Sequence, residues 1–244
     1  MRCHGARPRG DLRVVALPGA ARARRAIAAL EWERMEGYYA ARAGEYEAVY
    51  AKPERQADLA ELKDWLARRA RGRVILEVAC GTGYWTAIAA ATARAIVATD
   101  ANAEPLAIAR AKALGAHVTF RTADANALPR FARRFDCGMA HFWWSHVPRP
   151  RIGAFLAHFS ARLSRRASLL LIDNRFVARS STPIARRDRD GNTYQIRTLR
   201  SGARYEVIKN FPSRREIDAA LRTVCSHCEV RELAYYWAAH GVLT

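Results

Sequence analysis

Three acidic residues stand where they could hold a nucleoside. Glu77, Asp100 and Asp124 each lie at or just after the end of a short apolar run that resembles a buried strand. The carboxyl ends of parallel strands meet at one edge of a sheet, where ligands bind in open α/β folds. Gly81 and Gly83 follow the first run and let the backbone approach a ligand without obstruction by a Cβ atom. We interpret Asp100 as an acceptor for two ribose hydroxyls and Asp124 as an acceptor for an adenine amino group.

The glycine pattern separates two classes of nucleoside cofactor. A dinucleotide site uses G-x-G-x-x-G, whose third glycine permits close helix packing and whose helix N-terminus faces a pyrophosphate. Here Thr86 occupies the third position, Trp85 crowds the turn, and Glu77 would repel a pyrophosphate. The same carboxylate is favourable beside the ammonium group of a methionine moiety. The spacing therefore favours S-adenosylmethionine (SAM), with a NAD-dependent Rossmann oxidoreductase as the alternative.

Four segments together resemble the successive motifs of the class I SAM-dependent methyltransferases. They are VILEVACGTGYWT (74–86), IVATDAN (96–102), TADANALP (122–129) and FDCGMAHFWWSHVP (135–148). The chain looks most like the small single-domain branch of UbiE-type and small-molecule enzymes, over residues 36–240. This resemblance implies a doubly wound, Rossmann-like seven-stranded sheet with one antiparallel strand, flanked by helices.

The resemblance also implies which residues contact the cofactor. Carried over by position, the methionine end would meet Glu77, Ala79, Gly81 and Gly83, the ribose region Asp100 and Asn102, and the adenine Asp124 and Ala125. Residues 35–50 resemble the N-terminal helix that covers the cofactor in these enzymes, and Tyr38 and Arg42 share one face of it. Arg42 would pair with the methionine carboxylate. The alternative is that the tyrosines of this helix only pack it onto the domain.

The segment HFWWSH (141–146) is the most informative one for the substrate. Methyl transfer from a sulfonium requires an in-line approach in dry surroundings, so positioning dominates. Trp143 and Trp144 can supply an apolar wall that also attracts a cationic methyl donor. His141 or His146 can take a proton near neutral pH. No protein base is needed when the acceptor is already nucleophilic, and tryptophans after a strand are also common core residues.

Residues 174–212 interrupt the alternation of helix and strand and contain a predicted hairpin, 193–199 with 203–209. This insertion would lie above the fifth strand, beside the mouth of the active site. Its candidates for binding a polar or anionic substrate are Arg175, Tyr194 and Arg197. The alternative is a solvated cover without contact to the substrate.

The remaining pattern predicts the elements that must position these residues. Apolar runs at 73–79, 95–99, 116–121, 135–142 and 168–173 predict five strands, and the segments between them are mostly helical in spacing. Strands separated by such helices form right-handed crossovers and a doubly wound sheet. Ser213 begins a final helix, and residues 230–243 supply one or two closing strands. The fold class is therefore α/β.

The charge of the chain invites a different interpretation. Its 244 residues include 41 basic and 23 acidic ones, a net charge of +18, which is typical of proteins that bind nucleic acids. Only four of the basic residues are lysines, and no basic tract interleaved with aromatics is present. A dispersed arginine-rich face explains this charge better, with an acidic small substrate near Arg42, Arg175 or Arg197. An RNA-modifying methyltransferase remains the alternative.

The chain is expected to form one domain over residues 35–244, preceded by a basic extension, residues 1–34. No apolar run reaches the about 18 residues of a membrane span. Five cysteines without regular spacing argue against a disulfide framework, and Cys225 with Cys228 forms only half of a zinc site, so no metal is predicted. We expect a cytoplasmic enzyme that methylates oxygen, nitrogen or carbon of a small metabolite and releases S-adenosylhomocysteine (SAH), with the oligomeric state left open.

Overall fold

Short apolar runs of the sequence form one seven-stranded sheet. The computed structural model describes residues 35–244, and the expectations for residues 1–34 lie outside this range. In the order in which they pair, the strands are β3 (Val118–Thr122), β2 (Ala95–Asp100), β1 (Val74–Val78), β4 (Phe135–His141), β5 (Leu163–Asn174), β10 (Tyr236–Leu243) and β9 (Cys225–Glu232). The central strands β1 and β4 are buried over nearly their whole length, because helices cover both faces of the sheet.

One strand of this sheet runs against the others. β1 pairs in parallel with β2 and β4, β2 with β3, and β4 with β5, whereas β10 is antiparallel to both β5 and β9. The predicted doubly wound, Rossmann-like sheet with one antiparallel strand is therefore confirmed. The strand order reverses between β1 and β4, and ligands of open α/β sheets bind at such a switch point.

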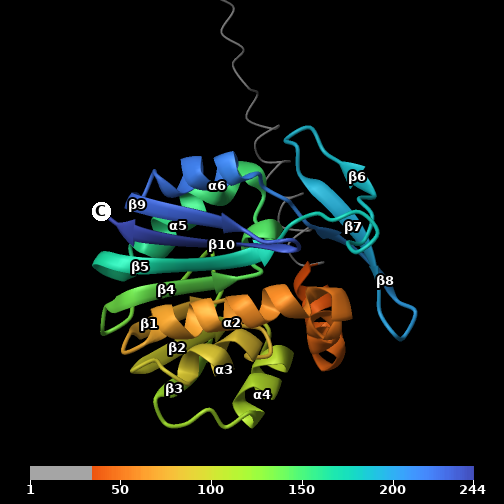
Figure 1. Cartoon of the computed structure of the whole chain (residues 1–244). Coiled ribbons are helices and arrows are strands. Elements are labelled where there is room, and N and C mark those ends of the chain that lie inside the picture. Colours follow the sequence, from red (N-terminus) through yellow and green to blue (C-terminus); the bar gives the residue numbers. More distant parts are fainter. Residues whose placement is uncertain (1–34) are drawn as a thin grey trace, which may run out of the picture. The chain divides into compact units, whose positions relative to one another are not determined.

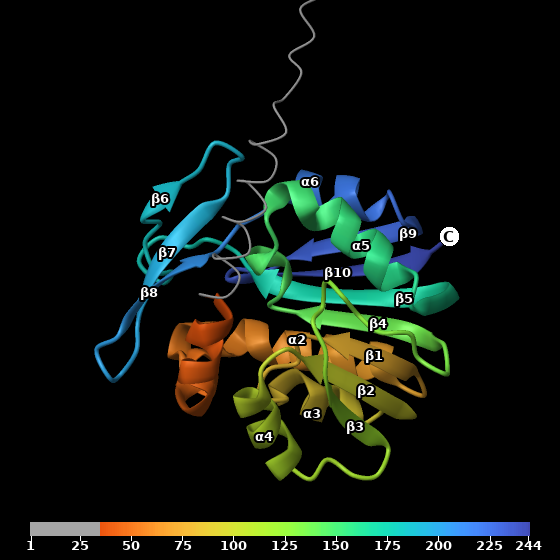
Figure 2. The same cartoon turned by 180° about the vertical axis from the view of Figure 1, so that it is seen from behind.

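Helices cover the two faces of the sheet (Figure 1 and Figure 2). Their bounds are α2 (Gln56–Ala70), α3 (Tyr84–Ala90), α4 (Ala103–Ala111), α5 (Ile152–Ser160) and α6 (Arg214–Leu221). α2 and α3 lie on one face, and α5 and α6 lie on the other. The stripe of Leu59, Leu62 and Leu66 on α2 is fully buried in the core beneath it, as helical spacing requires.

A second, three-stranded sheet follows β5. Its strands β6 (Arg186–Arg187), β7 (Thr193–Thr198) and β8 (Arg204–Ile208) pair in antiparallel fashion. β7 and β8 are the predicted hairpin, while the two-residue β6 is too short to leave a periodic pattern in the sequence. The small sheet stands beside the carboxyl end of β5 (Figure 1). The insertion is thus placed at the edge of the main sheet where ligands are expected.

The chain before α2 passes over the same edge. Residues 35–42 are α-helical, and the 3₁₀ helices η1 (Ala43–Ala51) and η2 (Pro53–Arg55) follow. The family resemblance implies one helix over 35–50, whereas the structure changes to the tighter 3₁₀ form at Ala43. Gly44, a poor helix former, stands at this change.

Two further observations concern residues 35–244. None of the helices in this range combines the length and the apolar character that crossing a membrane requires. The cysteines of this range, Cys80, Cys137, Cys225 and Cys228, are free thiols. Cys225 and Cys228 both lie on β9.

Replacement of Ser213 tests how the last helix is anchored. The Ser213 hydroxyl accepts a hydrogen bond from the backbone N–H of Glu216, and the Glu216 carboxylate accepts one from the backbone N–H of Ser213 at 2.7 Å. Ser213→Ala removes the side-chain acceptor and should lower the free energy of unfolding by about 1 kcal/mol, measured by urea denaturation. Ser213→Thr keeps the hydroxyl and should retain most of the stability. An equal loss in both variants would show that the capping bond is not the cause.

Candidate functional site

The loop between β1 and α3 is built on left-handed backbone conformations. Ala79, Gly81 and Gly83 have φ angles of 52°, 56° and 75°. A Cβ atom at Gly83 would lie 3.0 Å from the Cβ atom of Ala109 on α4. Both the φ angle and this close approach therefore require glycine at position 83. The loop presents bare backbone at the switch point between β1 and β4.

The carboxylate of Asp100 ties the end of β2 to this loop. Its Oδ2 accepts the backbone N–H of Gly81 at 2.8 Å, and its Oδ1 accepts the backbone N–H of Asn102 at 3.0 Å. Burial raises the pKa of Asp100, although these backbone bonds oppose the shift. A carboxylate oxygen has two lone pairs, so each oxygen can accept a further hydrogen bond from a ligand hydroxyl. The Asn102 side chain donates to the carbonyl oxygen of Glu36 at 3.2 Å and so fastens the first helical residues to this site.

Glu77 lies beneath the glycine loop. Its side chain is 1% exposed, and its Oε2 accepts the hydroxyl of Thr86 at 2.7 Å. Burial raises the pKa of Glu77 to about 7, and the bond from Thr86 opposes this shift. His141 Nδ1 is 3.9 Å from Glu77 Oε1, and burial lowers the pKa of His141 to about 3. Thr86, the residue that departs from the dinucleotide pattern, thus holds Glu77 against α3.

Asp124 shapes the turn after β3. Its Oδ1 accepts the backbone N–H of Asn126 at 2.8 Å and the side-chain amide of the same residue at 3.1 Å. Ala125, between them, is buried. The acidic residues expected at consecutive strand ends therefore stand there, with Glu77 on β1, Asp100 at the end of β2 and Asp124 after β3.

A cavity of about 90 Å³ opens beyond the ends of β4 and β5, lined by residues 39–55 and by the second sheet. Its cationic lining residues are Arg42, Lys52, Arg55, Arg197 and Lys209. No acidic residue of the described range 35–244 is among the lining residues. Tyr46, Tyr50 and Phe142 add aromatic walls. So much positive charge around one small space gives the cavity a positive potential, which favours an anion over a cation.

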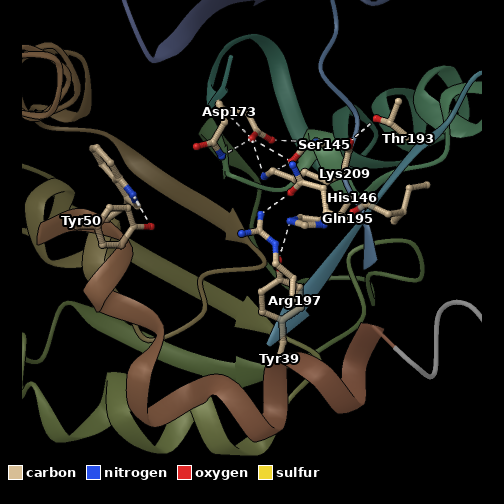
Figure 3. Close-up of polar contacts among 12 residues, drawn as sticks. Tyr39, Tyr50, Ser145, His146, Asp173, Thr193, Gln195, Arg197 and Lys209 are labelled. Carbon is tan, nitrogen blue, oxygen red and sulfur yellow. Dashed lines mark hydrogen bonds and ion pairs between the residues drawn. The ribbon is translucent and has the colours of Figure 1, made fainter. Parts of the chain in front are cut away.

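The hydrogen bonds of His146 define its tautomer (Figure 3). Its Nδ1 lies 2.8 Å from the carbonyl oxygen of Ile208, which can only accept, so Nδ1 carries the proton. Its Nε2 therefore accepts the hydroxyl of Tyr39 at 2.7 Å. Burial, and next the charge of Lys209, lowers the pKa of His146 to about 3. His146 is thus neutral near pH 7 and holds the Tyr39 hydroxyl at the cavity.

A buried network holds Lys209 beside His146 (Figure 3). The ammonium group donates to Ser145 Oγ at 2.6 Å and to Asp173 Oδ1 at 3.3 Å. Asp173 also accepts the backbone N–H and the hydroxyl of Ser145, at 2.8 and 3.0 Å. Burial lowers the pKa of Lys209 to about 8, although Asp173 opposes the shift. Burial alone would raise the pKa of Asp173, but Lys209 and its other neighbours lower it below the ordinary value.

Part of the predicted set meets at this cavity. Arg42, His146 and Arg197 line it. The guanidinium of Arg42 lies 5.5 and 5.2 Å from the ring centres of Tyr38 and Tyr46. Tyr38 itself is 2% exposed and packs the first helical residues onto the domain. The packing role considered for the tyrosines thus holds for Tyr38, while Arg42 faces the cavity.

Other predicted residues lie outside the cavity lining. Their contacts are Trp143 with Phe155, Trp144 with Trp237, Arg175 with Glu232, Tyr194 with Asp188, and His141 with Trp85. The neighbours His141 and Phe142 both lie near Trp85 of α3, but only Phe142 lines the cavity, whereas His141 is buried with its Nδ1 3.9 Å from Glu77 Oε1. Sequence position alone does not distinguish these two directions.

Several residues that line the cavity or lie directly behind its lining are not among the site residues predicted from the sequence. Asp173 stands at the carboxyl end of β5, so the strand-end rule that identified the other acidic residues also applies to it. Lys209 is one of only four lysines in the chain, which is a weaker signal. Tyr39 lies in the segment 35–50 that resembles the cofactor-covering helix, whereas Lys52 and Arg55 carry no local signal and reach the cavity only through folding.

Comparisons with known proteins agree with this architecture. A family model described as a methyltransferase domain matches residues 75–166. The solved structure of DhpI with SAH is 28% identical and covers 86% of this chain and 95% of that one, with a TM-score of 0.70. The DhpI complex with SAM and HEP has the same identity and coverage of this chain, covers 96% of its own chain, and has a TM-score of 0.72.

A more distant structure shows the same fold. SAM-bound CalS10, an amino pentose methyltransferase from Micromonospora echinaspora, is 18% identical, covers 82% of this chain and 96% of its own, and has a TM-score of 0.52. No curated protein matches the chain.

These similarities decide between the two cofactor classes. The matched residues 75–166 contain the glycine loop and the ends of β2 and β3. They favour the methyltransferase over the NAD-dependent oxidoreductase. The finer assignment to a UbiE-like branch stays a prediction. The chain is an S-adenosylmethionine-dependent methyltransferase.

Proposed function

We propose that this enzyme transfers the methyl group of SAM to an oxygen atom of a small, negatively charged molecule and releases SAH. The observation that carries the proposal is the set of cationic side chains around one cavity whose lining, within residues 35–244, contains no acidic residue. Such a site attracts an anion and repels a cation. A volume of about 90 Å³ favours a small molecule over an RNA strand.

The charges of the cavity favour oxygen over nitrogen or carbon as the acceptor atom. An aliphatic amine is itself cationic near neutral pH, so Arg197 and Lys209 would repel it. A carbon acid needs a base, and His146 is a weak one because its pKa is about 3 and its free nitrogen accepts the Tyr39 hydroxyl. An oxyanion is already nucleophilic and is attracted by the same cations.

The residues around the glycine loop fit the cofactor. The bare backbone at Gly83 and the remaining lone pairs of Asp100 are the features that support this fit. We assign the methionine end to Glu77, Ala79, Gly81, Gly83 and Arg42, the ribose to Asp100 and Asn102, and the adenine to Asp124 and Ala125; the buried Tyr38 keeps a packing role. When bound, SAM supplies an electrophilic methyl group on a sulfonium sulfur.

The chain's own residues act mainly by positioning the acceptor. Arg197 and Lys209 hold its oxyanion through charge-assisted hydrogen bonds. His146 is a positioning residue, since it fixes the Tyr39 hydroxyl that faces the same space. Phe142 keeps water from this end of the cavity. Rate acceleration then follows from the in-line geometry that these contacts impose.

Asp100→Ala tests the ribose assignment. The variant loses the acceptor of the ribose hydroxyls, so the Kd for SAH should rise at least tenfold, or about 1.4 kcal/mol, in calorimetric titrations. Asp64→Ala removes an exposed carboxylate of α2 and is the matched control, with no change expected. Unchanged affinity in an Asp100→Ala protein with wild-type thermal unfolding would refute the assignment.

The pKa of Lys209 predicts how anion binding depends on pH. Lys209 is charged below its pKa of about 8 and loses this charge as the pH rises through that value. Sulfate remains a dianion over this pH range, so the enzyme saturated with SAH should bind it less tightly as the pH rises. Because bound sulfate stabilises the charged form of Lys209, the midpoint of this decrease should lie above the pKa of the free enzyme. Lys209→Arg keeps its charge over this range and should flatten the profile. The same slope in both proteins would rule out Lys209 as its origin.

The acceptor class can be tested without knowing the acceptor. Metabolite extracts are divided on an anion-exchange resin, and each fraction is incubated with the enzyme and SAM labelled in its methyl group. Label should enter products from the retained, anionic fraction. Arg197→Gln should reduce this incorporation more than Arg68→Gln, a change of an exposed arginine on α2. Incorporation confined to the unretained fraction would contradict the proposal.

A further inference from the structure

The cavity contains a second group of cations besides Arg197 and Lys209. Lys52 Nζ donates to the carbonyl oxygen of Ser180 at 2.7 Å, and Arg55 Nη2 donates to the Ser180 hydroxyl at 2.9 Å. Arg55 Nη1 also reaches Asn174 Oδ1 at 3.4 Å. Asn174 ends β5, so this group lies at the same edge of the sheet.

Within the described range, neither Lys52 nor Arg55 has a carboxylate partner in an ion pair. Arg55 is 7% exposed, and among residues 35–244 no ion pair within 4.0 Å joins it or Lys52 to an acidic residue, in contrast to the pair of Lys209 with Asp173. Burial, and next the charge of Arg55, lowers the pKa of Lys52. Glu54 accepts the Ser180 hydroxyl at 2.9 Å but is itself exposed. A buried charge without a counter-charge is destabilising, and an anionic ligand would remove this imbalance.

The guanidinium of Arg55 is held in a fixed orientation. Its central carbon lies 5.3 Å from the ring centre of Tyr235 and 5.5 Å from that of Tyr236. Cation–π contacts of this kind and the bonds to Ser180 restrict the rotation of the side chain. Tyr236 itself lines the cavity. Arg55 is therefore preorganised, unlike a surface arginine that samples many rotamers.

One short segment connects the two groups of cations. Arg55 donates to the hydroxyl of Ser180, and Arg197 Nη1 donates to the hydroxyl of Thr182 at 2.8 Å. Residues two apart have Cα atoms at most about 7 Å from each other. The intervening Ser181 also lines the cavity. Both groups thus border one space that a molecule of a few bonds can span.

We infer that Lys52 and Arg55 form a second anion subsite, and that the methyl acceptor is a small molecule with two negatively charged groups a few bonds apart. One group binds at Arg197 and Lys209, and the other binds at Lys52 and Arg55. The inference rests on the proposed function and narrows its substrate class. A singly charged acceptor would leave the cations at one end of the cavity without a counter-charge.

Inorganic diphosphate and sulfate are probes for the second subsite. The full chain, saturated with SAH, is titrated with each anion by calorimetry, and the ratio of the two affinities is compared among variants. Diphosphate can reach both groups of cations, so it should bind at least tenfold more tightly than sulfate. Arg55→Gln and Lys52→Gln should each remove most of this advantage. Arg68→Gln, which removes an exposed charge from α2, should leave it unchanged.

The outcomes separate this inference from the function on which it rests. If Arg197→Gln weakens sulfate binding while neither Arg55→Gln nor Lys52→Gln alters the ratio, the second subsite is refuted and Arg55 has a structural role only. If Arg197→Gln leaves sulfate binding unchanged, the proposed anionic site itself fails. Affinity for SAH and thermal unfolding are measured for each variant. Should Arg55→Gln not fold, Lys52→Gln decides, because that side chain is less buried.

Discussion

The buried carboxylate of Asp173 is the contact on which the cavity depends. It joins three segments that are distant in sequence: the end of β5, Ser145 in the turn after β4, and Lys209 after β8. A carboxylate without access to water is stable only when its oxygens are fully bonded and a cation is close. Here backbone and side-chain donors and the ammonium of Lys209 meet that condition. The same carboxylate therefore fixes the small sheet at the edge of the large one and places a cation at the cavity.

The arrangement of charge around this contact explains how a strongly basic chain acquires a specific site. Within residues 35–244, several arginines pair with acidic side chains at the surface, as Arg68, Arg69, Arg186 and Arg222 do. In the cavity, by contrast, cations from three parts of the chain come together, and Asp173 neutralises only Lys209 within ion-pair distance. Burial, and next the charge of Lys209, lowers the pKa of His146 and keeps it neutral. The net charge of the chain therefore does not reveal this clustering, which arises only when the folded chain brings the cations to one cavity.

The sequence predicts most of the large sheet because its signals are local. Apolar runs bounded by turns identified β1 to β4 within a few residues, and the capping residue Ser213 marked the start of α6. β5 begins at Leu163, whereas the apolar run predicted a start at Ser168. The sequence pattern misses the first residues of this strand because two exposed arginines, Arg165 and Arg166, interrupt the apolar run. The change from α-helix to 3₁₀ helix at Ala43 and the short strand β6 depend on packing between segments and leave no periodic signal.

The sequence by itself determined the class of fold, the glycine loop and the acidic residues at the ends of β1, β2 and β3, because each follows from a backbone requirement within a few neighbouring residues. The tertiary structure decided which basic and aromatic side chains line the cavity. Arg197 and Arg175 look alike in sequence, yet only Arg197 lines the cavity, while Arg175 pairs with Glu232. The reason is that the cavity is assembled from residues 39–55, the edge of the main sheet and the inserted sheet. Their relative placement is set by contacts over more than a hundred residues of separation, such as that of Tyr39 with His146.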